Sequence, residues 1–197
     1  GISAAYYLRK AGYPVTVYDK MPEAGGMLTY GIPADRLAKD VVQRQINAFK
    51  TMGIEFKFNV TVGQQGVTLT DLRKKFQHVF LASGAWGERT LAMEKAELLT
   101  PGIDFLAAMG LGKKPALGKR VLIIGGGNVA VDVAVTASRL GAEQVTMVCL
   151  ESRDTMPAFE EEIAEALHEG VTILPSFGPN KIMEKKGQLT GMEVVSC

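Results

Sequence analysis

The segment from Lys119 to Glu151 constrains the fold of this chain more than any other part of it. It contains a short β-branched run at Val121–Ile124, three glycines at 125–127, and apolar residues at helical spacing over Asn128–Leu140. A second apolar run, Val145–Leu150, follows. Short β-branched runs are typical of strands buried on both faces, whereas apolar residues three and four positions apart are typical of a helix. The segment therefore predicts a strand, a glycine turn, a helix and a second strand.

The small residues of this turn have the spacing of a dinucleotide-binding site. Gly125, Gly127 and Ala130 match the pattern G-x-G-x-x-G/A, in which the glycines permit the tight turn and the approach of a pyrophosphate, and the alanine permits close helix–strand packing. The phosphates would lie on free N–H groups at the helix N-terminus. Glu151 follows Ala130 by 21 positions, where a ribose-binding acid is expected. The alternative, an ordinary tight turn with a surface glutamate, explains the glycines but not the position of the acid.

The composition excludes several classes of protein. The net charge is +1 and both signs are mixed along the sequence, which argues against binding to nucleic acid or to an anionic membrane. No apolar run approaches the roughly 20 residues of a membrane span, and we do not expect the first residues to be a signal peptide. The two cysteines, Cys149 and Cys197, exclude a disulfide framework, a CxxC pair and an iron–sulfur site within these residues, and they favour the cytoplasm. We expect Cys149 to be a buried strand residue rather than a nucleophile.

The start of the chain has the pattern of the second half of another dinucleotide-binding unit. A helix is predicted over Gly1–Ala11, followed by a strand over Val15–Tyr18 that ends in Asp19. In this interpretation Gly1 is the last glycine of a fingerprint whose first strand and first two glycines are missing, and Asp19 is a second ribose-binding acid. The alternative is an amphipathic helix followed by an ordinary strand.

Between these units the sequence alternates between loops and regular elements. Met21–Pro33 is a loop in which Gly25 and Gly26 suit a backbone that runs close to a flat ligand. Acids in the first turn of a predicted helix at Ala158–Glu169 complement its dipole, so we interpret Glu160–Glu162 as a solvated face rather than a catalytic cluster. The remaining predicted elements are a helix capped by Asp35 and ending at Met52, strands over Ile54–Val62 and His78–Ala82, a helix over Thr70–Phe76, a short helix over Ile103–Met109, a strand over Val171–Leu174, and a hairpin of Lys181–Lys185 with Leu189–Val195.

Several sequence motifs recur in family order along the chain. They are GISAAYYL from Gly1, GGM at 25–27 with GIP at 31–33 and Arg36-Leu37, LASGA at 81–85, GGGNVA at 125–130 with Asp132, and MPA at 156–158. Together they resemble the flavin/pyridine-nucleotide oxidoreductases typified by the glutamate synthase small (beta) subunit. The same module occurs in dihydropyrimidine dehydrogenase and in electron-bifurcating ferredoxin:NADP oxidoreductases.

The resemblance implies an α/β fold with two Rossmann-like dinucleotide-binding domains. Residues 1–105 would be a partial FAD-binding domain, truncated at its start, and residues 106–197 an inserted NAD(P)-binding domain; the linker-like composition of Leu98–Gly118 also places a boundary here. By position, the resemblance implies that Gly1 contacts the FAD pyrophosphate and that Asp19 and Lys20 contact its adenosine ribose. The flavin ring would be lined by Gly26, Met27 and Arg36, the adenine by Val62, and the flank of the cofactor by Ser83 and Gly84. The NAD(P) pyrophosphate would be bound by Gly126, Gly127, Asn128 and Val129. A cation beside exposed N–H groups suits a diphosphate, although the residues alone, without the resemblance, favour a helix-surface role for Arg36.

One departure from the family concerns the nucleotide. Members that use NADPH carry paired basic residues where this chain has Leu150-Glu151-Ser152. A carboxylate accepts hydrogen bonds from both ribose hydroxyls but repels a 2′-phosphate, so Glu151 favours NAD(H) over NADP(H). Arg153 is close enough to complicate this preference. A second departure is the absence of the segments that complete the FAD site and of the cysteine-rich region that can hold iron–sulfur clusters in the parent protein.

We therefore expect a flavoprotein oxidoreductase that passes hydride and electrons between NAD(H) and FAD, onward to a partner domain or subunit. Since the cofactors carry the chemistry, no catalytic acid, base or nucleophile and no metal ligand is assigned. Two alternatives stay open at this point. One is an NADPH-using glutamate synthase small subunit, and the other is a nucleotide-binding or scaffold module without turnover of its own.

Overall fold

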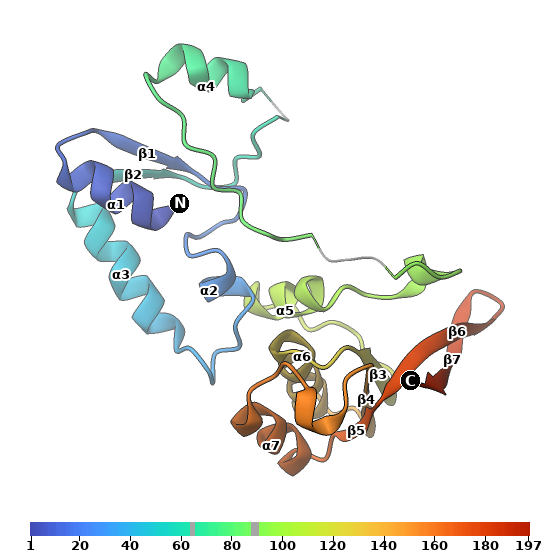
Figure 1. Cartoon of the computed structure of the whole chain (residues 1–197). Helices are drawn as coiled ribbons and strands as arrows, with labels where there is room; N and C mark the ends of the chain where they lie inside the picture. The colour runs from blue at the N-terminus through green and yellow to red at the C-terminus, as the bar shows by residue number, and fades with distance from the viewer. Residues whose placement is uncertain (64–65, 88–90) are drawn as a thin grey trace. The chain divides into compact units, whose positions relative to one another are not determined.

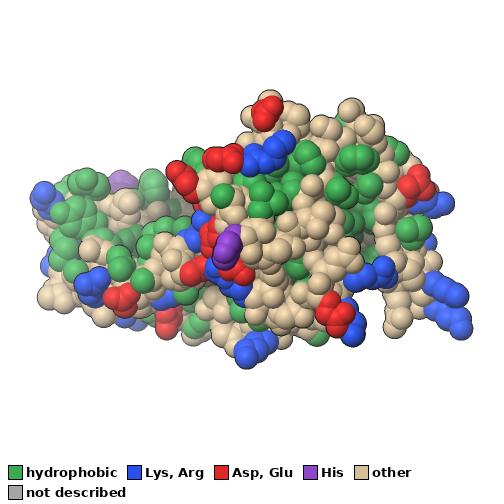
Figure 2. Space-filling model, turned by 90° about the horizontal axis from the view of Figure 1, so that it is seen from below, with side chains coloured by type: hydrophobic (Ala, Val, Ile, Leu, Met, Phe, Trp, Pro, Cys, Tyr) green, Lys and Arg blue, Asp and Glu red, His purple; other side chains and the backbone are tan. Residues whose placement is uncertain are grey.

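The computed structural model describes residues 1–63, 66–87 and 91–197. The chain separates into two compact units, which we call the first unit (Gly1–Trp86) and the second unit (Gly87–Cys197), and each is considered by itself. No helix in the described ranges is long and apolar enough to cross a membrane. Acidic and basic side chains are interspersed on the face drawn in Figure 2, in keeping with the near-zero net charge.

A three-stranded parallel sheet organises the second unit (Figure 1). Its strands are β3 (Arg120–Ile124), β4 (Gln144–Cys149) and β5 (Thr172–Pro175), in that spatial order. Helix α6 (Asn128–Arg139) connects β3 to β4, and α7 (Glu160–His168) connects β4 to β5. Parallel neighbours need such crossover helices. The strand, turn, helix and strand predicted from the sequence are therefore confirmed.

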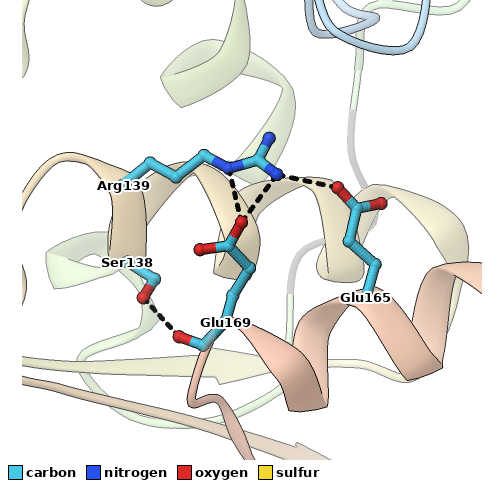
Figure 3. A network of polar contacts seen from close by, with 4 residues as sticks. All are labelled: Ser138, Arg139, Glu165 and Glu169. Carbon is cyan, nitrogen blue, oxygen red and sulfur yellow. Dashed lines mark hydrogen bonds and ion pairs between the residues drawn. The ribbon is translucent and has the colours of Figure 1, made fainter.

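The core of the second unit lies between this sheet and its helices. Met147 of β4, Val131 of α6 and Ile163 of α7 are all at most 1% exposed. Arg139 at the end of α6 forms ion pairs with Glu165 of α7 and with Glu169, the residue that follows α7, at 2.9 and 2.7 Å; Figure 3 shows these contacts. Because the three side chains stay partly exposed, we expect these pairs to add little to folding stability.

Smaller elements complete the second unit. They are η1 (Ala96–Leu98), α5 (Gly102–Gly110), η2 (Arg153–Thr155) and an antiparallel hairpin of β6 (Phe177–Lys185) and β7 (Gln188–Ser196). The two units divide between residues 86 and 87, whereas the sequence places a domain boundary between 105 and 106. The difference arises because α5 buries Phe105 and Leu106 and packs against α6. The assignment of the two domains to FAD and NAD(P) stays a prediction.

The first unit contains a two-stranded parallel sheet. Helix α1 (Ile2–Lys10) leads into β1 (Val15–Tyr18), as predicted. Helix α3 (Lys39–Thr51) leads into β2 (Ile54–Lys57), and β1 pairs with β2 in register, Val15 opposite Ile54. The buried side chains Ala24, Val42 and Ile46 form its core, against which Ile2, Leu37, Phe49, Phe56 and Phe58 pack.

Two predicted strands of the first unit differ from the structure: one is shorter than expected, and the other is not a strand. The strand expected over Ile54–Val62 ends at Lys57, because Asn59 has a left-handed φ of +58° and the Val60 N–H donates to the Asp19 carbonyl across a bend. The segment His78–Ala82 is not a strand. Its apolar residues Phe80 and Leu81 are about 70% exposed, and neither described strand of this unit pairs with it.

Helix starts also differ from those predicted. Helix α3 begins at Lys39 rather than after Asp35, because the Leu37 N–H donates to the Pro33 carbonyl in a separate preceding turn. Helix α4 (Leu69–Lys75) begins one residue before Thr70 with Thr68 as its N-cap. Thr68 and Asp71 form a reciprocal capping box, which satisfies two free N–H groups at the start of the helix.

Candidate functional site

The glycine turn after β3 supplies the local geometry of the candidate site. Gly125 has a φ of +127°, a conformation that disfavours any residue with a Cβ atom. Its N–H donates to the Val148 carbonyl at 2.8 Å, which extends the pairing of β3 with β4 to the last residue before the turn. A Cβ atom on Gly125 would also lie 3.6 Å from the Ala130 Cβ. Small residues at 125 and 130 thus let the strand turn directly into the helix.

Gly126 is the residue that approaches the neighbouring strand most closely. A Cβ atom built on it would lie 2.9 Å from the Cys149 Cβ and 3.2 Å from the carboxylate Oε2 of Glu151. The turn after β3 and the end of β4 are therefore packed together without space for a side chain. The spacing of the motif predicts the tight turn at Gly125 and the approach of the pyrophosphate at Gly127, but no steric role for Gly126.

Helix α6 begins directly after this turn. Gly127 is its N-cap, and no side chain in the described residues caps this end. The Ala130 and Val131 N–H groups donate to the Gly127 carbonyl, at 2.9 and 3.2 Å, so the N–H groups of Asn128 and Val129 precede the first intrahelical bond. With the positive end of the helix dipole, these donors favour an anion.

The segment that follows β4 approaches the same turn at both ends. At its start the carboxylate of half-buried Glu151 lies beside Gly126, and the Ser176 N–H donates to the Glu151 carbonyl at 2.8 Å. At its end the Ala158 N–H donates to the Gly126 carbonyl at 3.1 Å. Residues 151–158 therefore form a loop, here called the acidic loop, that encloses one side of the glycine turn.

Arg153 lies within the acidic loop and is engaged by Glu160 of α7. Its Nη1 donates to Oε2 at 3.0 Å and its Nη2 to Oε1 at 2.5 Å, a two-bond geometry that uses both carboxylate oxygens. The bonds from Arg153 hold the pKa of Glu160 below its ordinary value, and the same bonds raise the pKa of Arg153. Glu160 is thus on an exposed face, as predicted, but it also has a specific partner that the sequence did not indicate.

Cys149 ends β4 immediately before this loop. Its side chain is 2% exposed. Burial raises the pKa of the thiol, and the charge of Glu151 raises it further. Since the thiolate is the nucleophilic form, this environment suppresses reactivity. The prediction of a buried residue is confirmed.

The glycine-rich loop of the first unit is folded more tightly than an irregular loop. It contains the short helix α2 (Met27–Tyr30), which begins directly after Gly26. Gly25 has a φ of +123°, and a Cβ atom there would lie 2.0 Å from the Thr29 Oγ1. The Thr29 hydroxyl donates to the Ala24 carbonyl at 2.8 Å. Only a glycine fits at 25, whereas a Cβ atom at Gly26 would meet no described atom within 4 Å.

Lys39 binds backbone carbonyls at the end of this loop, a role that the sequence did not predict. Its ammonium group donates to the Leu28 carbonyl at 2.9 Å and to the Ile32 carbonyl. Burial lowers the pKa of this ammonium group, and Asp35 partly opposes the shift. No spacing rule identifies a lysine that binds carbonyls at a helix end seven or more residues away, so the sequence carried no signal for it.

Two of the predicted flavin-site segments are brought together in the first unit. Gly1 is the N-cap of α1, and a Cβ atom on it would lie 3.2 Å from the Ala82 Cβ, next to Ser83 and Gly84. Gly84 has a φ of +75°. The start of α1 is therefore close to the small-residue turn.

The remaining residues assigned to the FAD site each have a separate local environment. The Asp19 carboxylate accepts a hydrogen bond from the Met21 N–H at 2.9 Å, and the Lys20 ammonium lies 5.0 Å from the centre of the Trp86 ring. Arg36 is half-buried and Val62 is 40% exposed. A pocket of the first unit is lined by other residues, namely Leu69, Arg73, Phe76, Gln77, His78, Val79 and Leu81.

A family model described as pyridine nucleotide-disulphide oxidoreductase matches residues 1–192. The chain belongs to the pyridine nucleotide-disulphide oxidoreductase family. This confirms the resemblance drawn from the motifs, and with the two parallel sheets it confirms the α/β, Rossmann-like fold class.

Several curated relatives are named as subunits or chains of oxidoreductases. The chain is 38% identical over 200 residues to the NADP(+)-dependent formate dehydrogenase subunit beta of Moorella thermoacetica, covering 99% of this chain and 28% of that protein. It is 36% identical over 209 residues to the glutamate synthase [NADPH] small chain of Escherichia coli, covering 99% and 44%. It is 35% identical over 188 residues to the NAD-dependent dihydropyrimidine dehydrogenase subunit PreT homolog of Salmonella typhi, covering 94% and 45%. The chain thus spans less than half the length of each.

A solved structure shows the same fold. FprA from Mycobacterium tuberculosis superposes with a TM-score of 0.71 at 16% identity, over 98% of this chain and 65% of that one. At this identity the likeness concerns the fold alone.

Proposed function

We propose that the second unit binds the adenosine and pyrophosphate part of a nicotinamide dinucleotide, with NAD(H) preferred over NADP(H). The observation that carries this proposal is the position of the Glu151 carboxylate against Gly126, one residue before the N-cap of α6. The N–H groups of Asn128 and Val129 would receive the pyrophosphate. The Glu151 carboxylate would accept hydrogen bonds from the ribose hydroxyls and would repel a 2′-phosphate.

We further propose that the first unit contributes to an FAD site. The backbone at Gly26 is open to the approach of a flat ligand, and Gly1 lies near the small-residue turn at Ser83 and Gly84. These features fit the diphosphate and ring of a flavin, with Met27 and Arg36 beside it, Asp19 and Lys20 at its ribose and Val62 toward its adenine. When bound, NAD(H) and FAD would supply hydride transfer.

The residues of this chain would then position the cofactors and would not themselves react. The α6 N-terminus and Glu151 would hold and orient the nucleotide, and the buried thiol of Cys149 would stay protonated beside it. Electrons would pass onward to a partner subunit or domain, since relatives bear the names of subunits of larger oxidoreductases. The two free cysteines support a cytoplasmic location.

The alternative is a preference for NADPH. Relatives named for NADPH and NADP(+) support it, as does the presence of Arg153 in the acidic loop. Against it, Glu151 lies at the glycine turn and Arg153 is already paired with Glu160.

Calorimetric titration of the purified chain with NADH and NADPH, and absorbance titration with FAD, tests the proposal. We expect one NADH site per chain and weaker binding of NADPH. Equal or stronger NADPH binding would reverse the nucleotide preference. Failure to bind either nicotinamide nucleotide at millimolar concentration would instead indicate a scaffold role.

A further inference from the structure

The Arg153–Glu160 ion pair stands beside the acid that the proposed function assigns to the ribose. Arg153 follows Glu151 by two residues in the acidic loop. The loop is fixed to the carbonyl of Gly126 at Ala158 and lies against the same glycine at Glu151. Arg153 is therefore held near the end of β4, where the adenosine ribose would lie.

Both terminal nitrogens of the Arg153 guanidinium group are hydrogen-bonded to the Glu160 carboxylate. Two parallel hydrogen bonds, of 3.0 and 2.5 Å, join its Nη1 and Nη2 to the two oxygens of Glu160. This fork is the same geometry by which an arginine recognises a phosphate group. A carboxylate that occupies it competes directly with a 2′-phosphate for the same donors.

We propose that Glu160 determines nucleotide specificity by pairing with Arg153 and withholding its guanidinium group from the 2′-phosphate of NADP(H). Glu160 is thus a positioning residue that acts through Arg153. This inference rests on the proposed nucleotide site. It explains how a chain with an arginine in the acidic loop can still prefer a nucleotide with a free 2′-hydroxyl group.

The exposure of the pair makes the proposal testable without loss of the fold. The side chains of Arg153 and Glu160 are 36% and 73% exposed. Ion pairs of this exposure contribute little to folding stability. Replacing Glu160 by glutamine keeps its size and its place in the first turn of α7 while it removes the charge that holds Arg153.

The test measures dissociation constants for NADH and NADPH with Glu160→Gln, with Arg153→Gln/Glu160→Gln, and with Glu169→Gln as a matched control. Glu169, which follows α7, binds Arg139 in a similar ion pair (Figure 3), and Arg139 lies at the opposite end of α6 from the glycine turn. We expect Glu160→Gln to strengthen NADPH binding about tenfold while NADH binding changes less than about twofold. The double variant should lose this gain, and Glu169→Gln should change neither constant.

Two outcomes separate this inference from the proposed function. If the unsubstituted chain binds NADH but Glu160→Gln leaves NADPH binding unchanged, or if the double variant keeps the gain, only the role of Glu160 is overturned. If neither the chain nor any variant binds either nucleotide, the proposed site itself is wrong and this inference is overturned with it.

Discussion

The Glu151 carboxylate lies against the glycine turn, with its Oε2 atom 3.2 Å from the position that a Cβ atom on Gly126 would occupy. The parallel pairing of β3 and β4, with Ile124 opposite Val148, brings the two residues together across 25 positions of sequence. An acid, a bare backbone and a helix N-terminus thus meet at the carboxyl edge of the sheet, where α/β folds bind ligands.

Substituting Gly126 by alanine should damage both packing and nucleotide binding. The added Cβ would lie 2.9 Å from the Cys149 Cβ, so the turn must move away from β4. We expect a loss of about 1–3 kcal/mol in the free energy of unfolding, measured in urea, together with weaker NADH binding. Gly118→Ala is the control, because among the described atoms its Cβ would meet only the Arg120 carbonyl oxygen, at an ordinary contact distance of 3.6 Å. Equal stability of the two variants would contradict the close packing of Gly126 against Cys149.

Substituting Glu151 by arginine should change nucleotide preference. The carboxylate that repels a 2′-phosphate is replaced by a group that binds it, so the ratio of the NADPH and NADH dissociation constants should shift by at least about tenfold. Glu151→Gln, which removes only the charge, should shift the ratio less. An unchanged ratio for Glu151→Arg, measured calorimetrically, would show that this side chain does not contact the ribose.

Substituting Gly25 by alanine should destabilise the first unit through a collision as well as backbone strain. The new Cβ would lie 2.0 Å from the Thr29 Oγ1, at a φ of +123°. Gly12→Ala isolates the strain, because Gly12 has a φ of +95° and no described atom lies within 4 Å of its Cβ position. Thermal unfolding should show Gly25→Ala to be less stable than Gly12→Ala by about 1–3 kcal/mol. Similar values would indicate that the loop adjusts freely.

The two cysteines should differ widely in reactivity. Cys149 is buried and its thiol pKa is raised by burial and by Glu151, whereas Cys197 is exposed. The thiolate fraction of Cys149 should therefore rise only at a pH above that of an ordinary cysteine. Alkylation with iodoacetamide near pH 8, followed by mass spectrometry, should modify Cys197 first. Modification of both at similar rates would show that β4 opens readily.

The strand, helix and strand of the second unit were predicted well because the sequence patterns that specify them are local. The β-branched runs, the glycines and the helical spacing each specify their own element, and β3, α6 and β4 follow them closely. The prediction failed at His78–Ala82, since an apolar run becomes a strand only where a neighbouring strand offers hydrogen bonds, and Phe80 and Leu81 stay exposed.

The polar contacts of the site were harder to foresee than its backbone. Acids at the start of α7 are sufficiently explained by the helix dipole, so nothing in the spacing indicated that Glu160 pairs with Arg153. The bonds from Lys39 to carbonyls of the glycine-rich loop likewise depend on how that loop folds in space. Side-chain partners of this kind follow from tertiary packing rather than from spacing.

The central claim is that a nicotinamide dinucleotide binds at the glycine turn and the N-terminus of α6. Backbone amide chemical shifts of the ¹⁵N-labelled chain, recorded during titration with NADH, test it most directly. The largest changes should occur at Gly126, Gly127, Asn128, Val129 and Glu151, and they should saturate together. Saturable changes confined to other segments, such as the pocket of the first unit around Arg73 and Gln77, would contradict the claim.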